Sequence, residues 1–297
     1  MLSAETSATE KRAAFRAGLA SGRLLRFPGA FSPLVSLVIE ELNFDGVYVS
    51  GAVLSADLGL PDIGLTTLSE VAQRGRQIAR VTNLPAIIDA DTGFGEPMNA
   101  ARSVAEFEEL GLAGCHIEDQ VSPKRCGHLD GKQLVATVEM TRKLKAAVDA
   151  RHDPNFAVIA RTDARAVEGL DAAIERARAY ADAGADVIFP EALEDAGEFE
   201  TVRKAVDAPL LANMTEFGKS PLLDRRTLEN LGYNLVIYPV TALRLAMKAV
   251  EDGLGVLGGE GTQASIVDRM QHRKRLYELV RYAEYANYDK TLFDFEL

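Results

Sequence analysis

Short apolar segments recur eight times along this chain of 297 residues, and segments with helical spacing separate them. The apolar segments span residues 24–31, 46–51, 84–91, 113–119, 156–163, 185–192, 208–216 and 235–240. Most are nearly continuous in Val, Ile, Leu and Ala, which is typical of strands buried on both faces. The clearest helical patterns cover residues 66–83, 130–151 and 169–185. These alternations predict one α/β domain, a (β/α)8 TIM barrel over residues 1–297.

The main alternative is a doubly wound open sheet, which usually has fewer repeats and a glycine-rich phosphate loop after an early strand. No G-x-G-x-x-G motif follows an early apolar segment here, and the chain lacks G-x-x-x-x-G-K-[ST]. Residues 256–297, beyond the eighth segment, have helical spacing and several tyrosines. We therefore expect a C-terminal helical tail that packs on a neighbouring subunit rather than a second domain.

Charge and composition argue against several classes of protein. A net charge of −11 disfavours nucleic acid or an anionic membrane surface as a partner. No apolar stretch has the length of a membrane span, and the polar N-terminus does not resemble a secretory signal. Cys115 and Cys126 are the only cysteines, which does not indicate an oxidising compartment. We expect a cytoplasmic protein with a small-molecule ligand.

Polar side chains gather where the apolar segments end. Six of the eight segments end in ionisable or hydrogen-bonding groups, namely Tyr48 and Ser50, Asp89 and Asp91, Glu118 and Asp119, Arg161 and Asp163, Glu191, and Asn213 and Thr215. The carboxyl ends of barrel strands share one rim, where the active site of such a barrel is assembled. One carboxylate could be an ordinary helix cap, but a ring of polar groups predicts a functional site.

Three of these carboxylates predict a metal site. Asp89 and Asp91 are two residues apart at a strand end, so both side chains can point the same way. Glu118 ends the next strand and would be their lateral neighbour. Carboxylates without a thiolate or imidazole cage suit a hard cation, which favours Mg²⁺ with Mn²⁺ as an alternative. Gly93 and Gly95 would let the backbone turn close to a bound ligand.

Zinc is the other metal considered, because Cys115, His116, Cys126 and His128 lie near one another in the sequence. Their spacing is not that of a usual structural zinc site. We expect Cys115 to be a buried structural thiol and His116 to face a packed side of its strand.

Cys126 lies in the stretch SPKRCGHLDGK, residues 122–132, beside Lys124, Arg125 and His128. Nearby positive charge favours the thiolate, which is the reactive form of cysteine. A surface cysteine in a basic turn is the plain alternative. The combination with an acidic rim favours a reactive thiol.

These motifs together resemble the isocitrate lyase/phosphoenolpyruvate mutase superfamily. The similar stretches are SGAVLSADLGLPDIG, DADTGFG, HIEDQ followed by PKRCGH, ARTDA with GLDAAIERA, FPEA and NMTEFG, and the resemblance extends from about residue 25 into the C-terminal tail. The pattern K-[KR]-C-G-H is specific to the lyase branch. The resemblance implies a (β/α)8 barrel whose last helix is exchanged with a neighbouring subunit, usually within a homotetramer.

The resemblance also implies roles for the matching residues. Asp89 would bind Mg²⁺ directly, and Asp91 and Glu118 would hold its water shell. Cys126 would be the catalytic acid, on a loop that closes over the substrate. The substrate contacts would come from Ser50, Gly51, Ala52 and Arg161 at the oxo-acid end, from Gly127, His128, Asn213 and Thr215 at the succinyl carboxylates, and from Asp62, Lys124 and Glu191, which would complete the site.

The implied reaction is a Mg²⁺-dependent retro-aldol cleavage of 2-methylisocitrate, a tricarboxylate, to pyruvate and succinate in the methylcitrate cycle of propionate catabolism. Lys124, Arg161 and His128 can stabilise the negative charge that develops when the carbon–carbon bond breaks. A thiol in a cationic loop can protonate the succinyl carbanion and remain as a thiolate. Tyr48 is the candidate for the group that handles the alcohol proton.

Other functions stay open. Isocitrate lyases are longer and tend to have Trp where this chain has Phe189, and the smaller ring leaves room for a methyl group. Val240 lies near a family specificity position and leaves 2,3-dimethylmalate possible. The remaining alternatives are an oxaloacetate hydrolase, a phosphonomutase, or a non-catalytic barrel that binds a dicarboxylate.

Overall fold

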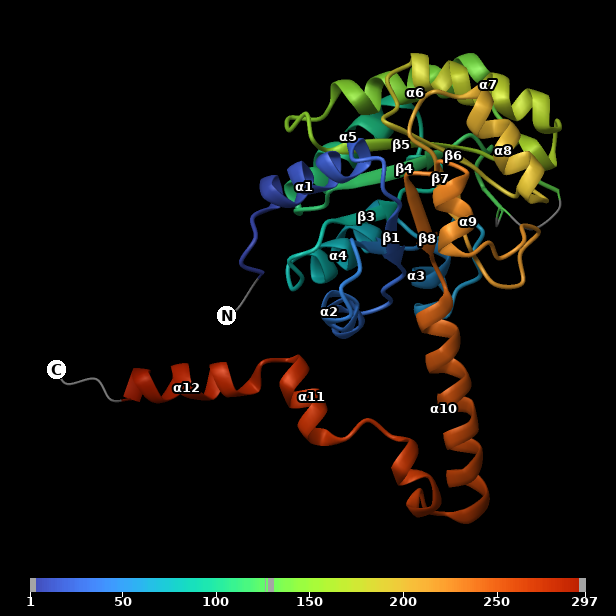
Figure 1. Ribbon diagram of the computed structural model, residues 1–297. Coiled ribbons are helices and arrows are strands. Elements are labelled where there is room, and N and C mark those ends of the chain that lie inside the picture. Colours follow the sequence, from blue (N-terminus) through green and yellow to red (C-terminus); the bar gives the residue numbers. More distant parts are fainter. Residues whose placement is uncertain (1–3, 126, 128–130, 294–297) are drawn as a thin grey trace.

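The computed structural model describes residues 4–125, 127 and 131–293, so Cys126 and His128 of the predicted site lie outside the described residues. Eight parallel strands alternate with helices in the body of the molecule (Figure 1). The strands are β1 (Leu25–Pro28), β2 (Val47–Val49), β3 (Ala86–Asp89), β4 (Gly114–Glu118), β5 (Ala157–Thr162), β6 (Val187–Pro190), β7 (Leu211–Asn213) and β8 (Leu235–Tyr238). Each lies inside one predicted apolar segment, so the predicted strands are confirmed.

The strands form a closed ring in chain order. Strands β2 to β6 pair in sequence, and β7, β8 and β1 form the other part of the sheet. A bridge between Gly29 and Tyr48 joins β1 to β2, and a bridge between Ile188 and Leu210 joins β6 to β7. The fold is therefore the predicted (β/α)8 barrel, and the open-sheet alternative is wrong.

Successive strand residues point alternately into the barrel and outward to the helices, as the period of a strand requires. Phe27, Tyr48 and Ile159 belong to the buried cluster inside the barrel. A larger cluster, which includes Ile88 and Cys115, fills the space between strands and helices. Helix α1 (Ala8–Ala20) contributes Phe15 and Leu19 to the interior cluster, so it covers the amino-terminal end of the barrel.

Helices surround the strands. They are α2 (Pro33–Glu41), α3 (Gly51–Asp57), α4 (Leu68–Ala79), α5 (Pro97–Glu109), α6 (Thr137–Asp149), the 3-10 helix η1 (Ala164–Ala166), α7 (Leu170–Asp182), α8 (Ala196–Ala205) and α9 (Arg225–Asn230). Thr67 caps α4 in a reciprocal hydrogen-bonded pair with Glu70, which fixes the start of that helix. Within the described ranges, none of the helices combines the length and apolar composition that crossing a membrane requires.

The predicted helix over residues 130–151 begins later than its sequence pattern. Helix α6 starts at Thr137. Before it, the Val121 amide donates to the Gln133 carbonyl oxygen at 2.8 Å, and the Val135 amide donates to the Asp119 carbonyl oxygen at 2.9 Å. This pairing holds the chain extended up to Val135 and brings Lys132 toward the strand ends.

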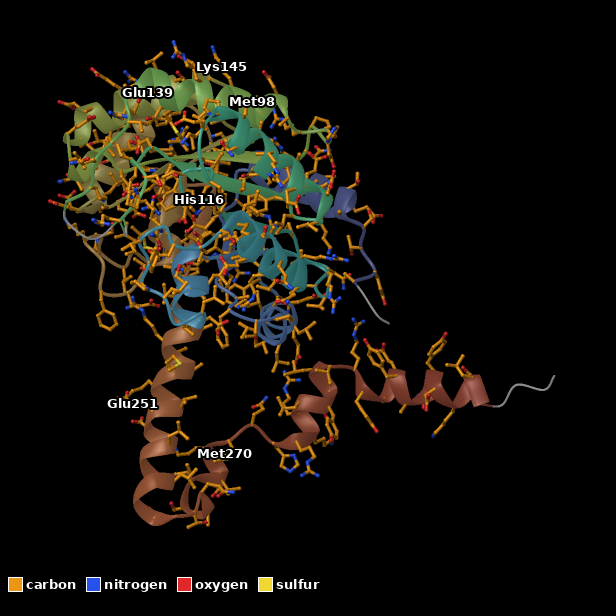
Figure 2. All side chains as sticks on the ribbon, turned by 180° about the vertical axis from the view of Figure 1, so that it is seen from behind. Met98, His116, Glu139, Lys145, Glu251 and Met270 are labelled. Carbon is orange, nitrogen blue, oxygen red and sulfur yellow. The ribbon has the colours of Figure 1, made fainter. Side chains whose placement is uncertain are left out.

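The chain leaves the barrel after β8 as a C-terminal arm, residues 241–293. The arm consists of α10 (Thr241–Glu260), the 3-10 helix η2 (Ala264–Arg269), α11 (Arg273–Leu279) and α12 (Tyr282–Phe293). Figure 1 shows α10 pointing away from the barrel, and Figure 2 shows Glu251 and Met270 standing clear of it. Within α10, which is described in full, no residue is buried. The predicted start of the tail at residue 256 falls inside α10, so the arm begins earlier, at residue 241.

Candidate active site

A cavity of about 400 Å³ lies at the carboxyl ends of the strands. Its walls include many of the predicted site residues: Tyr48, Ser50, Ala52, Asp62, Asp89, Lys124, Gly127, Arg161, Glu191, Asn213 and Thr215. They come from the ends of β2, β3 and β5 to β7 and from the segments that follow the strands. The structure therefore brings together residues that are more than 160 positions apart in the chain.

Gly51 lies against the wall of this cavity, directly beside Asp89. Its amide donates to Asp89 Oδ2 at 3.0 Å, and the Asp91 amide donates to Asp89 Oδ1 at 3.0 Å. A Cβ atom at position 51 would lie 2.9 Å from Asp89 Oδ2. Glycine leaves the room that the Asp89 carboxylate needs to approach the backbone this closely.

Asp89 and Asp91 are both buried, but their environments move their pKa values apart. Burial raises the pKa of the Asp89 carboxyl. The contact with His116 and the charges of Lys124 and Arg161 outweigh that effect and lower the pKa to about 2. Burial and the negative charge of Asp89 raise the pKa of Asp91 to about 6. Lys124 Nζ lies 2.9 Å from Asp91 Oδ1 and also pairs with Asp62.

Glu118 supplies the third buried carboxylate. Its Oε2 lies 3.3 Å from Arg161 Nε, whereas its Oε1 has no hydrogen-bond partner among the described residues. Burial raises the pKa of Glu118 well above its usual value. In the described part of the chain, no three His, Cys, Asp or Glu side chains converge closely enough to ligate one ion directly. One direct carboxylate ligand with the others acting through water fits this arrangement and is usual for Mg²⁺.

Arg161 is the cation at the centre of the site. Its Nε and Nη2 donate to the two carboxylate oxygens of Asp163 at 2.9 and 3.1 Å. Nη1 lies 3.1 Å from Glu191 Oε2. Burial would lower the pKa of Arg161, but Asp163, Glu118 and Glu191 raise it, so the guanidinium stays charged. The planar group is held on two edges, which fixes its orientation toward the cavity.

Tyr48, which lines the cavity, forms a buried pair with His116. The Tyr48 hydroxyl and His116 Nε2 share a hydrogen bond of 2.7 Å, and Nε2 lies 3.5 Å from Asp89 Oδ1. Burial raises the pKa of Tyr48 and lowers that of His116, so both groups are neutral at neutral pH. His116 is fully buried, as expected for a residue on a packed side of its strand, but its contact with Tyr48 was not predicted.

Cys115 and His116 cannot ligate the same zinc ion. Cys115 lies in the outer cluster between strands and helices, and its neighbour His116 points into the barrel. Burial raises the pKa of the Cys115 thiol, as expected for a structural cysteine. The zinc alternative therefore fails for this pair.

Most of one wall of the cavity was not predicted from the sequence. That wall is formed by Glu216, Phe217, Gly218, Pro239, Val240, Leu243 and Arg244, of which only Val240 was singled out. The Arg244 guanidinium lies over the Phe217 ring, 4.8 Å from its centroid, and donates to the Glu216 carbonyl oxygen at 2.8 Å. These residues follow β7 and β8, so the rule that barrel sites form at strand carboxyl ends could have identified them.

Phe189 does not line the cavity, in contrast to Val240. It is fully buried, with the Arg161 guanidinium over its ring at 5.1 Å and the His116 ring against it at 5.5 Å. Any influence of Phe189 on substrate size would therefore act through the position of Arg161.

Comparison with known proteins places the chain in a family. The model of the phosphoenolpyruvate phosphomutase family matches residues 15–256. The chain belongs to this family. It is 62% identical over 295 residues to a probable 2-methylisocitrate lyase of Corynebacterium glutamicum, covering 99% of this chain and 96% of the relative. It is 46% identical to the 2-methylisocitrate lyase of Bacillus subtilis, covering 97% and 95% of the two chains.

Solved structures agree with this assignment. A 2,3-dimethylmalate lyase superposes with a TM-score of 0.90 at 32% identity, covering 97% of this chain and 96% of the other. A phosphonopyruvate hydrolase in complex with oxalate and Mg²⁺ superposes with a TM-score of 0.86 at 32% identity, covering 93% and 97%. The chain is thus an enzyme of this family, and its curated relatives named above are carbon–carbon lyases.

Proposed function

We propose that the enzyme cleaves 2-methylisocitrate to pyruvate and succinate in the cytoplasm, in a retro-aldol reaction that requires Mg²⁺. The observation that carries this proposal is that Asp89, Lys124 and Arg161 line one cavity. Asp91 and Glu118 pair with Lys124 and Arg161 beside it. The names of the curated relatives support the choice of substrate.

The charge balance of the site supports a divalent cation. Among the described residues, the carboxyl groups of Asp62, Asp89, Asp91, Glu118, Asp163 and Glu191 outnumber the ammonium and guanidinium groups of Lys124, Lys132 and Arg161 that lie among them. An anionic substrate would add further negative charge. Bound Mg²⁺, or Mn²⁺ in its place, would supply positive charge at the oxo-acid end of the substrate. Asp89 would ligate it directly, and Asp91 and Glu118 would orient its waters.

The cavity walls offer contacts for both ends of the substrate. Ser50, Gly51, Ala52 and Arg161 would bind the oxo-acid end, Gly127, His128, Asn213 and Thr215 would bind the succinyl carboxylates, and Asp62, Lys124 and Glu191 would complete the site. Asn213 Nδ2 donates to Glu191 Oε2 at 3.2 Å, which orients the amide. Arg244 adds a second guanidinium to the wall, which suits a substrate with three carboxylates.

Two groups would handle protons on opposite sides of the bond that breaks. The Tyr48–His116 pair would take the proton of the substrate hydroxyl, so that this oxygen becomes the ketone oxygen of pyruvate. The electron pair of the broken carbon–carbon bond would remain on the succinyl carbon, and the Cys126 thiol would protonate it. Lys124 and His128 would stabilise the negative charge in the interval.

We also propose that copies of the chain associate through the C-terminal arm, as a homotetramer in which the last helix is exchanged. Met247, Val250, Leu254 and Leu257 of α10 lie on one side of the helix, and each is more than 40% exposed in the single chain. A contiguous apolar helix face of this kind marks a protein interface.

The test is pyruvate release from 2-methylisocitrate, followed with lactate dehydrogenase. Activity should require Mg²⁺ or Mn²⁺, disappear with EDTA and return when the ion is restored. Asp89→Asn should lower turnover at least about a hundredfold, whereas the exposed Asp171→Asn should leave it unchanged. Cleavage that persists in EDTA contradicts the metal-dependent mechanism. A higher kcat/KM for isocitrate or 2,3-dimethylmalate would replace the proposed substrate.

A further inference from the structure

Lys132 is a buried lysine that belongs to neither the cavity wall nor the predicted metal site. Its side chain is 1% exposed. Nζ donates to Asp163 Oδ1 at 2.9 Å and to the carbonyl oxygen of Gly127. A buried ammonium group is costly unless it is paired, and here both partners are residues of the active site.

The first partner connects Lys132 to the central guanidinium. Asp163 binds Arg161 through both carboxylate oxygens, so Lys132 and Arg161 share one carboxylate. The Asp163 amide also donates to Asp119 Oδ1 at 2.9 Å, which fixes the backbone that carries the carboxylate. Lys132 therefore offsets part of the negative charge that would otherwise face Arg161 alone.

The second partner connects Lys132 to the segment that contains position 126. A Cβ atom at Gly127 would lie 2.1 Å from Arg161 Nη2 and 2.8 Å from Glu191 Cγ, so the Gly127 backbone rests directly on the Arg161 guanidinium. On the other side, the buried Gln120 amide accepts from the Arg125 amide at 2.8 Å and donates to the Arg125 carbonyl oxygen at 2.9 Å.

We propose that Lys132 is a positioning residue that sets the backbone at Gly127 against the Arg161 guanidinium. Its ammonium joins the two through Gly127 and Asp163, and Gln120 fixes the chain one residue before position 126. The consequence for turnover rests on the proposed function, in which the residue between Arg125 and Gly127 donates the proton. The arrangement itself does not depend on that function.

The kinetic test compares Lys132→Met with Lys11→Met. Lys11, a residue of α1, is also buried, and it donates to the carbonyl oxygen of Ala79 in α4 at 2.9 Å, away from the cavity. Lys132→Met should lower kcat at least about tenfold, with the Mg²⁺ concentration for half-maximal activity unchanged, because Lys132 contacts none of the proposed metal ligands. Lys11→Met should leave kcat unchanged. A kcat within about twofold of the wild type in Lys132→Met, or an equal loss in Lys11→Met, overturns the proposal.

A second variant tests whether the loss of kcat in Lys132→Met comes from misfolding. A second measurement, hydrogen exchange, does not depend on enzyme activity. Lys132→Gln keeps a hydrogen-bond donor but is too short to reach both partners, so it should fold and show the same loss of kcat. Hydrogen exchange should become faster in the peptide over residues 119–127 of either folded variant and stay unchanged over residues 84–95. Unchanged hydrogen exchange over residues 119–127 overturns the proposed role of Lys132, whether or not the enzyme is active. A wild-type enzyme that releases no pyruvate would refute the proposed function but not the role of Lys132.

Discussion

The barrel and the C-terminal arm differ in how far they bury their apolar residues. Every residue of β3, β4 and β5 is buried, and the helices around them bury one face. Helix α10 has apolar residues at similar spacing but buries none of them in the single chain. The barrel therefore completes its core within one chain, whereas the arm presents an apolar face that only another surface could cover. Similar helical patterns thus give a buried face in the barrel helices and an exposed face in α10.

The two regions meet at the active-site cavity. Val240, the residue that precedes α10, lines the cavity together with Leu243 and Arg244 from the first turn of that helix. The remainder of α10 leaves the barrel (Figure 1). A displacement of the arm would therefore move one wall of the cavity. Substitutions in the barrel core, at the rim and along the arm can test folding, chemistry and association in turn.

The largest effect on folding is expected inside the barrel. Phe107 of α5 is fully buried, and Phe107→Ala should lower the free energy of unfolding by about 3–5 kcal/mol, because it removes apolar contacts and leaves a cavity. Phe217→Ala is the matched control, since Phe217 is 94% exposed and the change should cost no more than about 0.5 kcal/mol. Urea unfolding monitored by circular dichroism measures both. Equal costs would show that the barrel core is not the source of stability.

The next effect concerns the chemistry at the barrel rim. Cys126→Ser should lower turnover at least about a hundredfold while folding and Mg²⁺ binding stay intact, because a serine hydroxyl releases its proton far less readily than a thiol. Cys115→Ala provides the control, since Cys115 is buried outside the barrel ring and should not affect turnover. Near-normal turnover in Cys126→Ser would eliminate Cys126 as the proton donor.

The barrel and much of its rim could be predicted because both depend on simple periodicities. Apolar runs marked the buried strands, and polar residues at their carboxyl ends marked the cavity, including Asp89 and Arg161. Lys132 was assigned to a helix because the helical spacing continues toward it, whereas backbone pairing with residues 119–121 keeps it extended. The spacing of residues within either segment does not predict this pairing between the two segments.

The arm was harder to delimit from the sequence. Residues before and after position 256 have the same helical spacing, so the pattern could not show that α10 starts at Thr241 and leaves the barrel there. For the same reason the sequence did not identify Arg244 as a cavity residue. Which face of a helix is covered depends on neighbours that are distant in sequence or belong to another chain.

A smaller effect is expected where the two regions meet. Val240→Leu adds one methylene group to the cavity wall and should lower the ratio of kcat/KM for 2-methylisocitrate to that for isocitrate by about tenfold, the lower range for one methylene group. The two rates are measured as pyruvate and glyoxylate release. Val250→Leu is the control, because Val250 is exposed farther along α10. An unchanged ratio would mean that Val240 does not contact the part of the substrate that differs.

The smallest effect on folding is expected in the arm, where a single substitution should instead change association. Leu254 is 61% exposed, so Leu254→Ser should change the free energy of unfolding of the barrel by no more than about 0.5 kcal/mol. If the apolar face of α10 is an interface between copies of the chain, the variant should form smaller assemblies in analytical ultracentrifugation at equal concentration. Glu251→Ser is the matched control, since the Glu251 side chain is 76% exposed and charged. An unchanged mass for Leu254→Ser would refute association through this face, and a loss of stability like that of Phe107→Ala would show that the arm belongs to the same folding unit as the barrel core.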